Sequence, residues 1–325
     1  MADIARKHHF IPQFLLANFT PSGQRDDFLC VTDKQELKSH KAKPVNAGFQ
    51  KDLYRMDAEG VEPDVVETIL GLFESVAAPA VAHVIEYHSL PPRPLLDHLI
   101  ELVGVMILRV PAARKRMDEA LDRETKRLFR PYHTDPDVLR EQLKKLKEDG
   151  FELPAGLDYD TLNYEDLADF ARREDEYTVS LNKEWILMEM LKASAPAQMM
   201  LWGREWTVLV AGEGAGEFIS SDAPVCLCWT DPQRTDRGAH LIEPYTDLTV
   251  PLSKKVALQG RYEPGQPSLL TLNRRGVAEI NLGTILSADR FLYSSDKQFP
   301  FRQKNGSIGW YADLIIELRT SRRST

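Results

Sequence analysis

Cysteine is scarce in this sequence, and long hydrophobic runs are absent. The 325 residues include three cysteines, Cys30, Cys226 and Cys228. The N-terminal stretch lacks the apolar core of a signal peptide. Charged residues interrupt every apolar run within about a dozen residues, which is shorter than a membrane span. The small, odd cysteine count favours a reducing compartment, so we expect a cytoplasmic protein with no membrane-spanning segment.

Familiar catalytic motifs are missing as well. There is no G-x-S-x-G elbow, no H-E-x-x-H helix and no C-x-x-C pair. The glycine-rich GEGAGE at 212–217 lacks both the strand-to-helix context of a dinucleotide loop and the Walker lysine, so we predict a hairpin turn there. Cys226 and Cys228 are spaced C-x-C, whereas zinc knuckles use C-x-x-C, and buried strand residues are the better interpretation.

The overall composition is that of a globular protein with a sizeable core. Hydrophobic residues make up 43% and charged residues 28%, and the formal net charge is -8. An acidic balance excludes a bulk electrostatic binder of nucleic acid, although a local basic groove is compatible with it.

Apolar spacing predicts helices through most of the first two thirds of the chain. Three- and four-residue periodicity favours helices from Pro12, over 65–87, over a long segment after 95 that Pro111 kinks, and over 183–203. The charged segment 134–175 is expected to form solvated peripheral helices. Two short strand-like runs, 28–34 and 52–56, flank a polar loop and predict a small hairpin.

Beyond Trp206 the pattern changes to short runs rich in β-branched and aromatic residues, interrupted by one helix at 275–288. We therefore predict an α+β fold: a mainly helical region 1–205 with a small hairpin, and a β-rich, mostly antiparallel region 206–325. No linker separates the two regions, so they are expected to form one compact unit.

His8 and His9 open the segment KHHFIPQFLLANF. Adjacent residues on a helix point about 100° apart, so both rings serve one metal only if the backbone there is not helical. "HHFIP" resembles the opening of HNH endonuclease motifs, but the later metal-binding residues of that motif are missing. The alternative is structural: imidazoles that cap a helix or form hydrogen bonds inside a polar core. His9 and Gln13 are four apart and can meet.

Glu67, Glu74 and Arg109 are charges set in apolar segments. Glu67 and Glu74 are seven residues apart and share a helix face, and Arg109 is a lone cation in GVMILRVP. A carboxylate in such surroundings must be paired, bound to a metal or turned to solvent, and Arg109 is the natural partner. The set is either a structural ion pair or a site for a phosphate-bearing or metal-bound substrate.

Asp222 follows a predicted strand in FISSDAPV. With Ser220 and Ser221 it suits either a side-chain turn or a metal ligand or general base. Asn281, in the middle of the helix predicted at 275–288, should form hydrogen bonds with buried groups.

These motifs, taken in order, resemble the DUF4238 family, a bacterial family of unknown function. The N-terminal signature is the most specific part, and Met106 departs from the pattern because a polar residue is expected there. The matching positions are His8, His9, Pro12, Gln13, Leu16, Phe19, Glu67, Glu74, Arg109, Pro111, Arg114, Asp222, Pro224, Pro251 and Asn281.

The resemblance groups the polar residues into one expected pocket. Such a set suits hydrolysis of a phosphate-containing substrate, plausibly as a metal-dependent nuclease, with nucleic acid or a nucleotide as partner. The expected catalytic residues are His9, Gln13, Glu67, Arg109 and Asp222. The expected ligands for Mg²⁺, Mn²⁺ or Zn²⁺ are His8, His9, Glu67, Glu74 and Asp222. The alternative is a non-catalytic interaction or ligand-sensing protein in which the polar cluster is structural.

Overall fold

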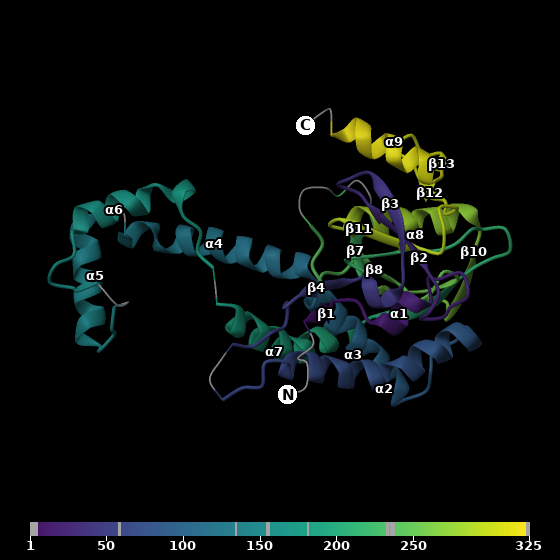
Figure 1. Ribbon diagram of the computed structural model, residues 1–325, viewed down its shortest axis with the longest axis horizontal. Coiled ribbons are helices and arrows are strands. Elements are labelled where there is room, and N and C mark those ends of the chain that lie inside the picture. The colour runs from purple at the N-terminus through teal and green to yellow at the C-terminus, as the bar shows by residue number, and fades with distance from the viewer. Residues whose placement is uncertain are drawn as a thin grey trace. The chain divides into compact units, whose positions relative to one another are not determined.

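The computed structural model describes residues 6–57, 60–133, 135–153, 157–180, 182–231, 234 and 238–322 (Figure 1). The chain divides into two compact units. The first unit comprises Met1–Ala113 and Lys183–Thr325, and the second comprises Arg114–Asn182.

A four-stranded antiparallel sheet joins distant parts of the first unit. Its strands run in the order β3 (Lys38–Ala42), β2 (Leu29–Asp33), β11 (Phe291–Ser294) and β6 (Ser220–Ser221). The early hairpin β2–β3 is therefore half of a sheet completed by residues from the end of the chain.

A second sheet has five strands in the order β10 (Leu269–Leu272), β5 (Glu205–Ala211), β9 (Val256–Arg261), β8 (Thr246–Pro251) and β7 (Cys226–Trp229). β10 runs parallel to β5, and the other pairs are antiparallel. In β7, Cys226 is buried as expected for a strand residue, but Cys228 is exposed.

GEGAGE connects these two sheets and is not a hairpin turn. It follows β5 of the five-stranded sheet, and the next strand, β6, belongs to the four-stranded one. Two pairs of short strands complete the β structure: β1 (Lys7–His9) with β4 (Phe49–Lys51), and β12 (Phe301–Arg302) with β13 (Ile308–Gly309).

Helices cover the sheets on more than one side (Figure 1). α2 packs against α3, and α3 packs against α7. The long helix predicted to be kinked at Pro111 is in fact two helices, because α3 ends at Leu108 and Pro111 begins α4. The helices of the first unit are α1 (Gln13–Ala17), α2 (Val65–Tyr87), α3 (Leu95–Leu108), α7 (Lys183–Trp202), α8 (Arg274–Ser287) and α9 (Tyr311–Ser321), with a short 3-10 helix η1 (Pro44–Asn46).

The α+β class is confirmed, but the predicted layout is only partly right. Strands occur from the N-terminus onward, and α8 and α9 lie near the C-terminus. β3 was expected to be a loop because KSHKA is polar, yet its backbone pairs with β2. The strand expected at 52–56 instead lies at Phe49–Lys51. β3 is held by backbone hydrogen bonds to the adjacent β2, and β4 by backbone hydrogen bonds to the distant β1. Both strands are largely exposed, so neither carries an apolar pattern.

One hydrophobic cluster runs through the first unit. It extends from Phe10 to Tyr293 and includes buried residues of α3, such as Leu99, and of β8 and β9, such as Leu258. Residues on both sides of position 205 therefore share a core. Among the helices of the described residues, α2 alone is long and apolar enough to cross a membrane by length and composition, with 28% of its most apolar window buried. Core helices of soluble proteins can have the same properties.

The second unit is helical, as expected for its charged sequence. It contains most of α4 (Pro111–His133), together with α5 (Pro136–Glu148), α6 (Tyr164–Arg172) and a 3-10 turn η2 (Glu174–Glu176). Among its described residues, Ala168 is the single buried one.

Candidate functional site

The two histidines lie on β1, not on a helix, and therefore point to opposite sides. The His8 ring is 1% exposed and stacks on Tyr54, with ring centroids 5.8 Å apart and planes 4° apart. Its Nδ1 accepts the backbone N–H of Tyr54 at 2.7 Å. His8 thus anchors the segment that follows β4.

His9 occupies a different environment. It is 7% exposed, its ring lies 5.7 Å from that of Phe49, and its Nδ1 is 3.4 Å from Gln13 Nε2. Its buried Nε2 makes no hydrogen bond of normal geometry with any described residue. Burial lowers the pKa of His9 to about 4, the Val45 carbonyl opposes this change, and the positive charge of Arg109 adds to it. The ring is therefore neutral near pH 7.

Arg109 joins three segments of the first unit. It is 2% exposed. Its Nη1 donates to Glu74 Oε1 at 2.8 Å, its Nη2 donates to the His9 carbonyl, and its own carbonyl accepts the Tyr54 hydroxyl at 2.7 Å. Burial alone would lower the pKa of Arg109, but Tyr54 and Glu74 more than compensate. The guanidinium is thus a neutralised link between α2, β1 and the end of α3.

Glu67 lies in the first turn of α2, near this link but outside the ion pair. Burial raises the pKa of Glu67 to about 7; the Arg109 charge opposes the shift, Glu74 adds to it, and the His9 backbone N–H opposes it. Its Oε2 is buried and has no hydrogen-bond partner among the described residues. Of the two predicted glutamates, Glu74 is the one paired with Arg109.

The structure brings together five of the predicted site residues. We call His9, Gln13, Glu67, Glu74 and Arg109, with Tyr54, the Arg109 cluster. His8 adjoins it through Tyr54. Tyr54 was missed by the sequence reasoning, because DLYRM was assigned to a strand and its hydroxyl was given no role. Burial raises the pKa of Tyr54 to about 12, so its hydroxyl keeps its proton and donates to Arg109.

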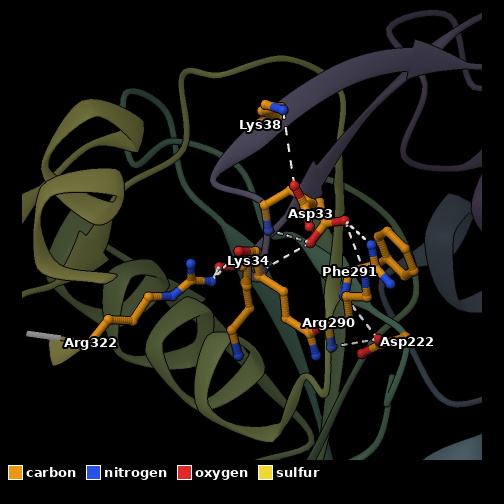
Figure 2. Close-up of polar contacts among 9 residues, drawn as sticks. Asp33, Lys34, Lys38, Asp222, Arg290, Phe291 and Arg322 are labelled. Atoms are coloured by element: carbon orange, nitrogen blue, oxygen red, sulfur yellow. Dashed lines mark hydrogen bonds and ion pairs between the residues drawn. The ribbon is translucent and has the colours of Figure 1, made fainter. Parts of the chain in front are cut away.

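Asp222 belongs to a different polar centre, which Figure 2 shows. It is 6% exposed, and its carboxylate accepts the backbone N–H groups of Asp289, Arg290 and Phe291 at 2.9, 2.7 and 2.8 Å. Burial raises the pKa of Asp222, and those three N–H groups oppose the shift. Asp222 thus anchors the turn that leads from α8 into β11.

Neighbouring charges complete this second centre (Figure 2). Arg290 donates twice to Asp33 Oδ2, at 2.9 and 2.7 Å, and Lys34 Nζ donates to the carbonyls of Ile285 and Ala288 at 2.6 and 2.8 Å. No hydrogen bond or ion pair in the described part of the chain joins Asp222 to the Arg109 cluster. The predicted residues therefore fall into two groups.

The donor set proposed for a metal does not gather in one place. Within the described residues there is no group of three or more His, Cys, Asp or Glu side chains that could hold a metal ion. His8 Nδ1 accepts from Tyr54, Glu74 pairs with Arg109, and Asp222 accepts three backbone N–H groups.

A cavity of about 410 Å³ in the first unit adjoins the Asp222 centre, and its lining includes Phe10 and Pro111, which are close in sequence to His9 and Arg109. Four aromatic residues and Val31 supply apolar surface, while exposed polar side chains such as His40 and Gln50 also line it. Asp222 is the one predicted site residue in the lining. The full lining is Phe10, Val31, His40, Asn46, Ala47, Gly48, Phe49, Gln50, Pro111, Ala112, Asp222, Asp289, Arg290, Phe291 and Tyr293.

Sequence reasoning missed this cavity because its walls come from segments far apart in the chain. Phe10 follows β1 and Phe49 opens its partner strand β4, whereas Phe291 and Tyr293 lie on β11. The available signal was local: apolar aromatic residues directly follow both the histidine pair and the loop before β4.

The fold and these two centres define an α+β protein with an internal ion-pair cluster and a partly aromatic cavity beside it. The chain belongs to the DUF4238 family, described as a protein of unknown function, whose model matches residues 7–298. The resemblance found in the sequence is thereby confirmed. No match was found among curated proteins or among solved structures.

Proposed function

We propose that the protein binds a small organic molecule in the 410 Å³ cavity. The volume lies in the range of small-molecule sites, which combine apolar walls with a few polar groups that fix orientation. Among the aromatic lining residues, the half-buried Phe49 and Phe291 suit a flat, largely apolar body, and the exposed His40 and Gln50 suit its hydrogen-bonding edge.

The cavity carries this proposal because the two predicted residues best suited to a phosphate or a metal, Arg109 and Asp222, are already engaged. Arg109 is neutralised by Glu74, and the Asp222 carboxylate is held by three backbone N–H groups. A substrate phosphate would have to compete with both sets of contacts. In this reading the polar clusters hold the walls of the cavity in place.

A variant that fills the cavity tests the proposal. Ala112, the second residue of α4, lines the cavity, and Ala312, the second residue of α9, is an exposed position of the same kind. Nucleosides, aromatic amino acids and heterocyclic carboxylic acids would be screened by thermal shift and ligand-observed NMR. We expect at least one probe to bind wild type and the Ala312→Phe control but not Ala112→Phe. Equal binding to both variants, or no binding at all, would contradict the proposal.

A second candidate function is hydrolysis of a phosphate-containing substrate, including nucleic acid or a nucleotide. Two buried atoms without hydrogen-bond partners favour it, His9 Nε2 and Glu67 Oε2. Buried groups with displaced pKa values are frequent at catalytic sites. In this scheme Glu67 supplies or accepts a proton, and neutral His9 is a base or a ligand for Mg²⁺, Mn²⁺ or Zn²⁺.

Activity assays separate the two candidates. The probes are single- and double-stranded DNA, RNA and a chromogenic phosphodiester, each with and without Mg²⁺, Mn²⁺ and Zn²⁺. Hydrolysis that Glu67→Gln and His9→Gln abolish would support the second candidate, with Glu62→Gln, an exposed glutamate before α2, as the control. Absence of hydrolysis in wild type under every condition would dismiss it. The cytoplasmic location expected from the sequence stays a prediction.

A further inference from the structure

The second unit is unusual because it has almost no interior. Ala168 is its single buried residue among those described, and α5 contributes none. Several of its large apolar side chains are instead exposed, among them Phe129 at 54% and Phe151 at 66%. A unit this small is marginal even with a normal core. Its apolar side chains therefore call for a covering surface.

The apolar side chains of α4 form a stripe. Met117, Leu121 and Leu128 recur at spacings of four and seven residues, which places them on one side of the helix. Met117 and Leu121 are half-buried, and Leu128 is 57% exposed, so the stripe is only partly covered. Helices with a partly covered apolar stripe commonly pair with another helix through it.

A basic stripe accompanies it on α4. Arg116, Arg123, Arg127 and Arg130 follow one another at spacings of seven, four and three, and all four are exposed. Arg127 pairs with Glu124, and Arg130 pairs with Glu174 of the same unit. Arg116 and Arg123 form no ion pair with any residue that the structure describes. Part of this positive charge thus lacks a counter-charge.

The complementary charge lies elsewhere in the same unit. The segment 158–176 is rich in acidic residues, and on α6 Glu165 and Asp169 are exposed and one helical turn apart. Asp169 also pairs with Arg172 of the same helix, so a partner's arginine would share this carboxylate or displace Arg172 from it. Phe170, beside them, is 44% exposed. One unit therefore presents both an apolar-basic surface and an apolar-acidic surface.

We propose that residues 114–182 form a self-association module in which two copies of this chain meet. The basic stripe of α4 in one copy faces the acidic α6 of the other. Because the two copies are related by a twofold axis, α6 of the first copy also faces α4 of the second. The apolar side chains beside both stripes become covered. A two-fold dimer of this kind uses the same surface on each subunit, so complementary charges on one unit make that surface self-complementary.

Charge reversal tests the arrangement on the full chain. Sedimentation velocity over a range of concentrations and salt should show a dimer that weakens as salt rises. Arg116→Glu with Arg123→Glu should reduce self-association by at least about tenfold, and so should Glu165→Lys with Asp169→Lys. Reversal of Arg275 and Arg319, exposed arginines outside the second unit, should leave it unchanged.

Mixing the two double variants gives the decisive readout. Neither double variant should pair with itself. In the mixture, the acidic α4 of the first variant faces the basic α6 of the second, and the unchanged α6 of the first faces the unchanged α4 of the second. A one-to-one heterodimer should therefore form. Circular dichroism on each variant verifies that the helices are intact. A monomer at every concentration, or a dimer insensitive to these reversals, would overturn the proposal. So would a monomeric wild type whose arginine stripe instead binds DNA or RNA.

Discussion

The two buried polar centres of the first unit differ in how completely their buried polar atoms are hydrogen-bonded. Around Asp222 the carboxylate is matched by three backbone N–H groups. Around Arg109, by contrast, the buried atoms His9 Nε2, Glu67 Oε2 and Arg109 Nε make no hydrogen bond of normal geometry with any described residue. Unpaired buried polar atoms cost free energy of folding. The Arg109 cluster therefore links three segments but carries this cost, whereas the hydrogen bonds to the Asp222 carboxylate stabilise the turn before β11.

Removal of the Arg109 side chain should have the largest effect on stability. Arg109→Met leaves Glu74 without its partner and breaks the contact with the His9 carbonyl, so we expect a loss of about 3–5 kcal/mol. Denaturant unfolding measures it. Arg109→Met combined with Glu74→Leu should recover a large part of the loss, because no buried charge is then left alone. A loss under about 1 kcal/mol for the single variant would show that the link is unimportant.

Asp222→Asn should have the next largest effect. The amide keeps one accepting oxygen but presents an N–H₂ group to backbone donors, so we expect a loss of about 2 kcal/mol. Urea unfolding should show a clear decrease in the free energy of unfolding for Asp222→Asn and none for the control Asp57→Asn, at an exposed aspartate. An unchanged midpoint would mean that the turn before β11 does not depend on the carboxylate.

Titration of Glu67 should make stability fall as pH rises. Its folded pKa of about 7 lies above the ordinary value of 4.5, so between these values the folded state holds more protons than the unfolded state. The folded state is therefore favoured below about pH 4.5, and that advantage is lost as pH rises through about 7. Glu67→Gln should flatten this decline, measured as the free energy of unfolding against pH.

His9 should act in the opposite direction. Its folded pKa of about 4 lies below the ordinary 6.5, so the unfolded state holds more protons between these values and stability rises with pH there. His9→Gln should remove that rise. A wild-type profile that neither variant alters would contradict both shifts.

Tyr54→Phe should have the smallest effect. It removes the hydroxyl that donates to the Arg109 carbonyl but keeps the ring stacked on His8, so we expect a loss of about 1 kcal/mol. Thermal unfolding measures this loss. The control is Tyr159→Phe, which removes an exposed hydroxyl in the second unit. A loss as large as that of Arg109→Met would mean that Tyr54 itself organises the cluster.

The sequence predicted those features that depend on local periodicity. The helices α2, α7 and α8 carry clear three- and four-residue spacing and form where expected. Asn281 also behaves as anticipated: it is fully buried, accepts from Ile219 N–H and donates to the carbonyls of Glu217 and Pro300. Burial of an amide in an apolar helix requires such partners.

Features that depend on pairing between distant segments could not be predicted. β4 is a strand only because its backbone pairs with β1, which lies on the far side of the β2–β3 hairpin in the chain. The cavity arises because β11 joins the sheet of β2, about 260 residues away in the chain, which no local pattern records. The pairing of Arg109 with a glutamate was foreseen from charge in apolar surroundings, whereas the use of Asp222 by three backbone groups was not.

We have proposed that the protein binds a small molecule in the cavity and not at the Arg109 cluster. A crystal structure with the strongest probe from the binding screen tests it most directly. We expect the probe to contact Phe49 and Phe291, with the Arg109–Glu74 pair intact. A probe bound instead at Glu67 and His9, with that pair opened, would contradict it.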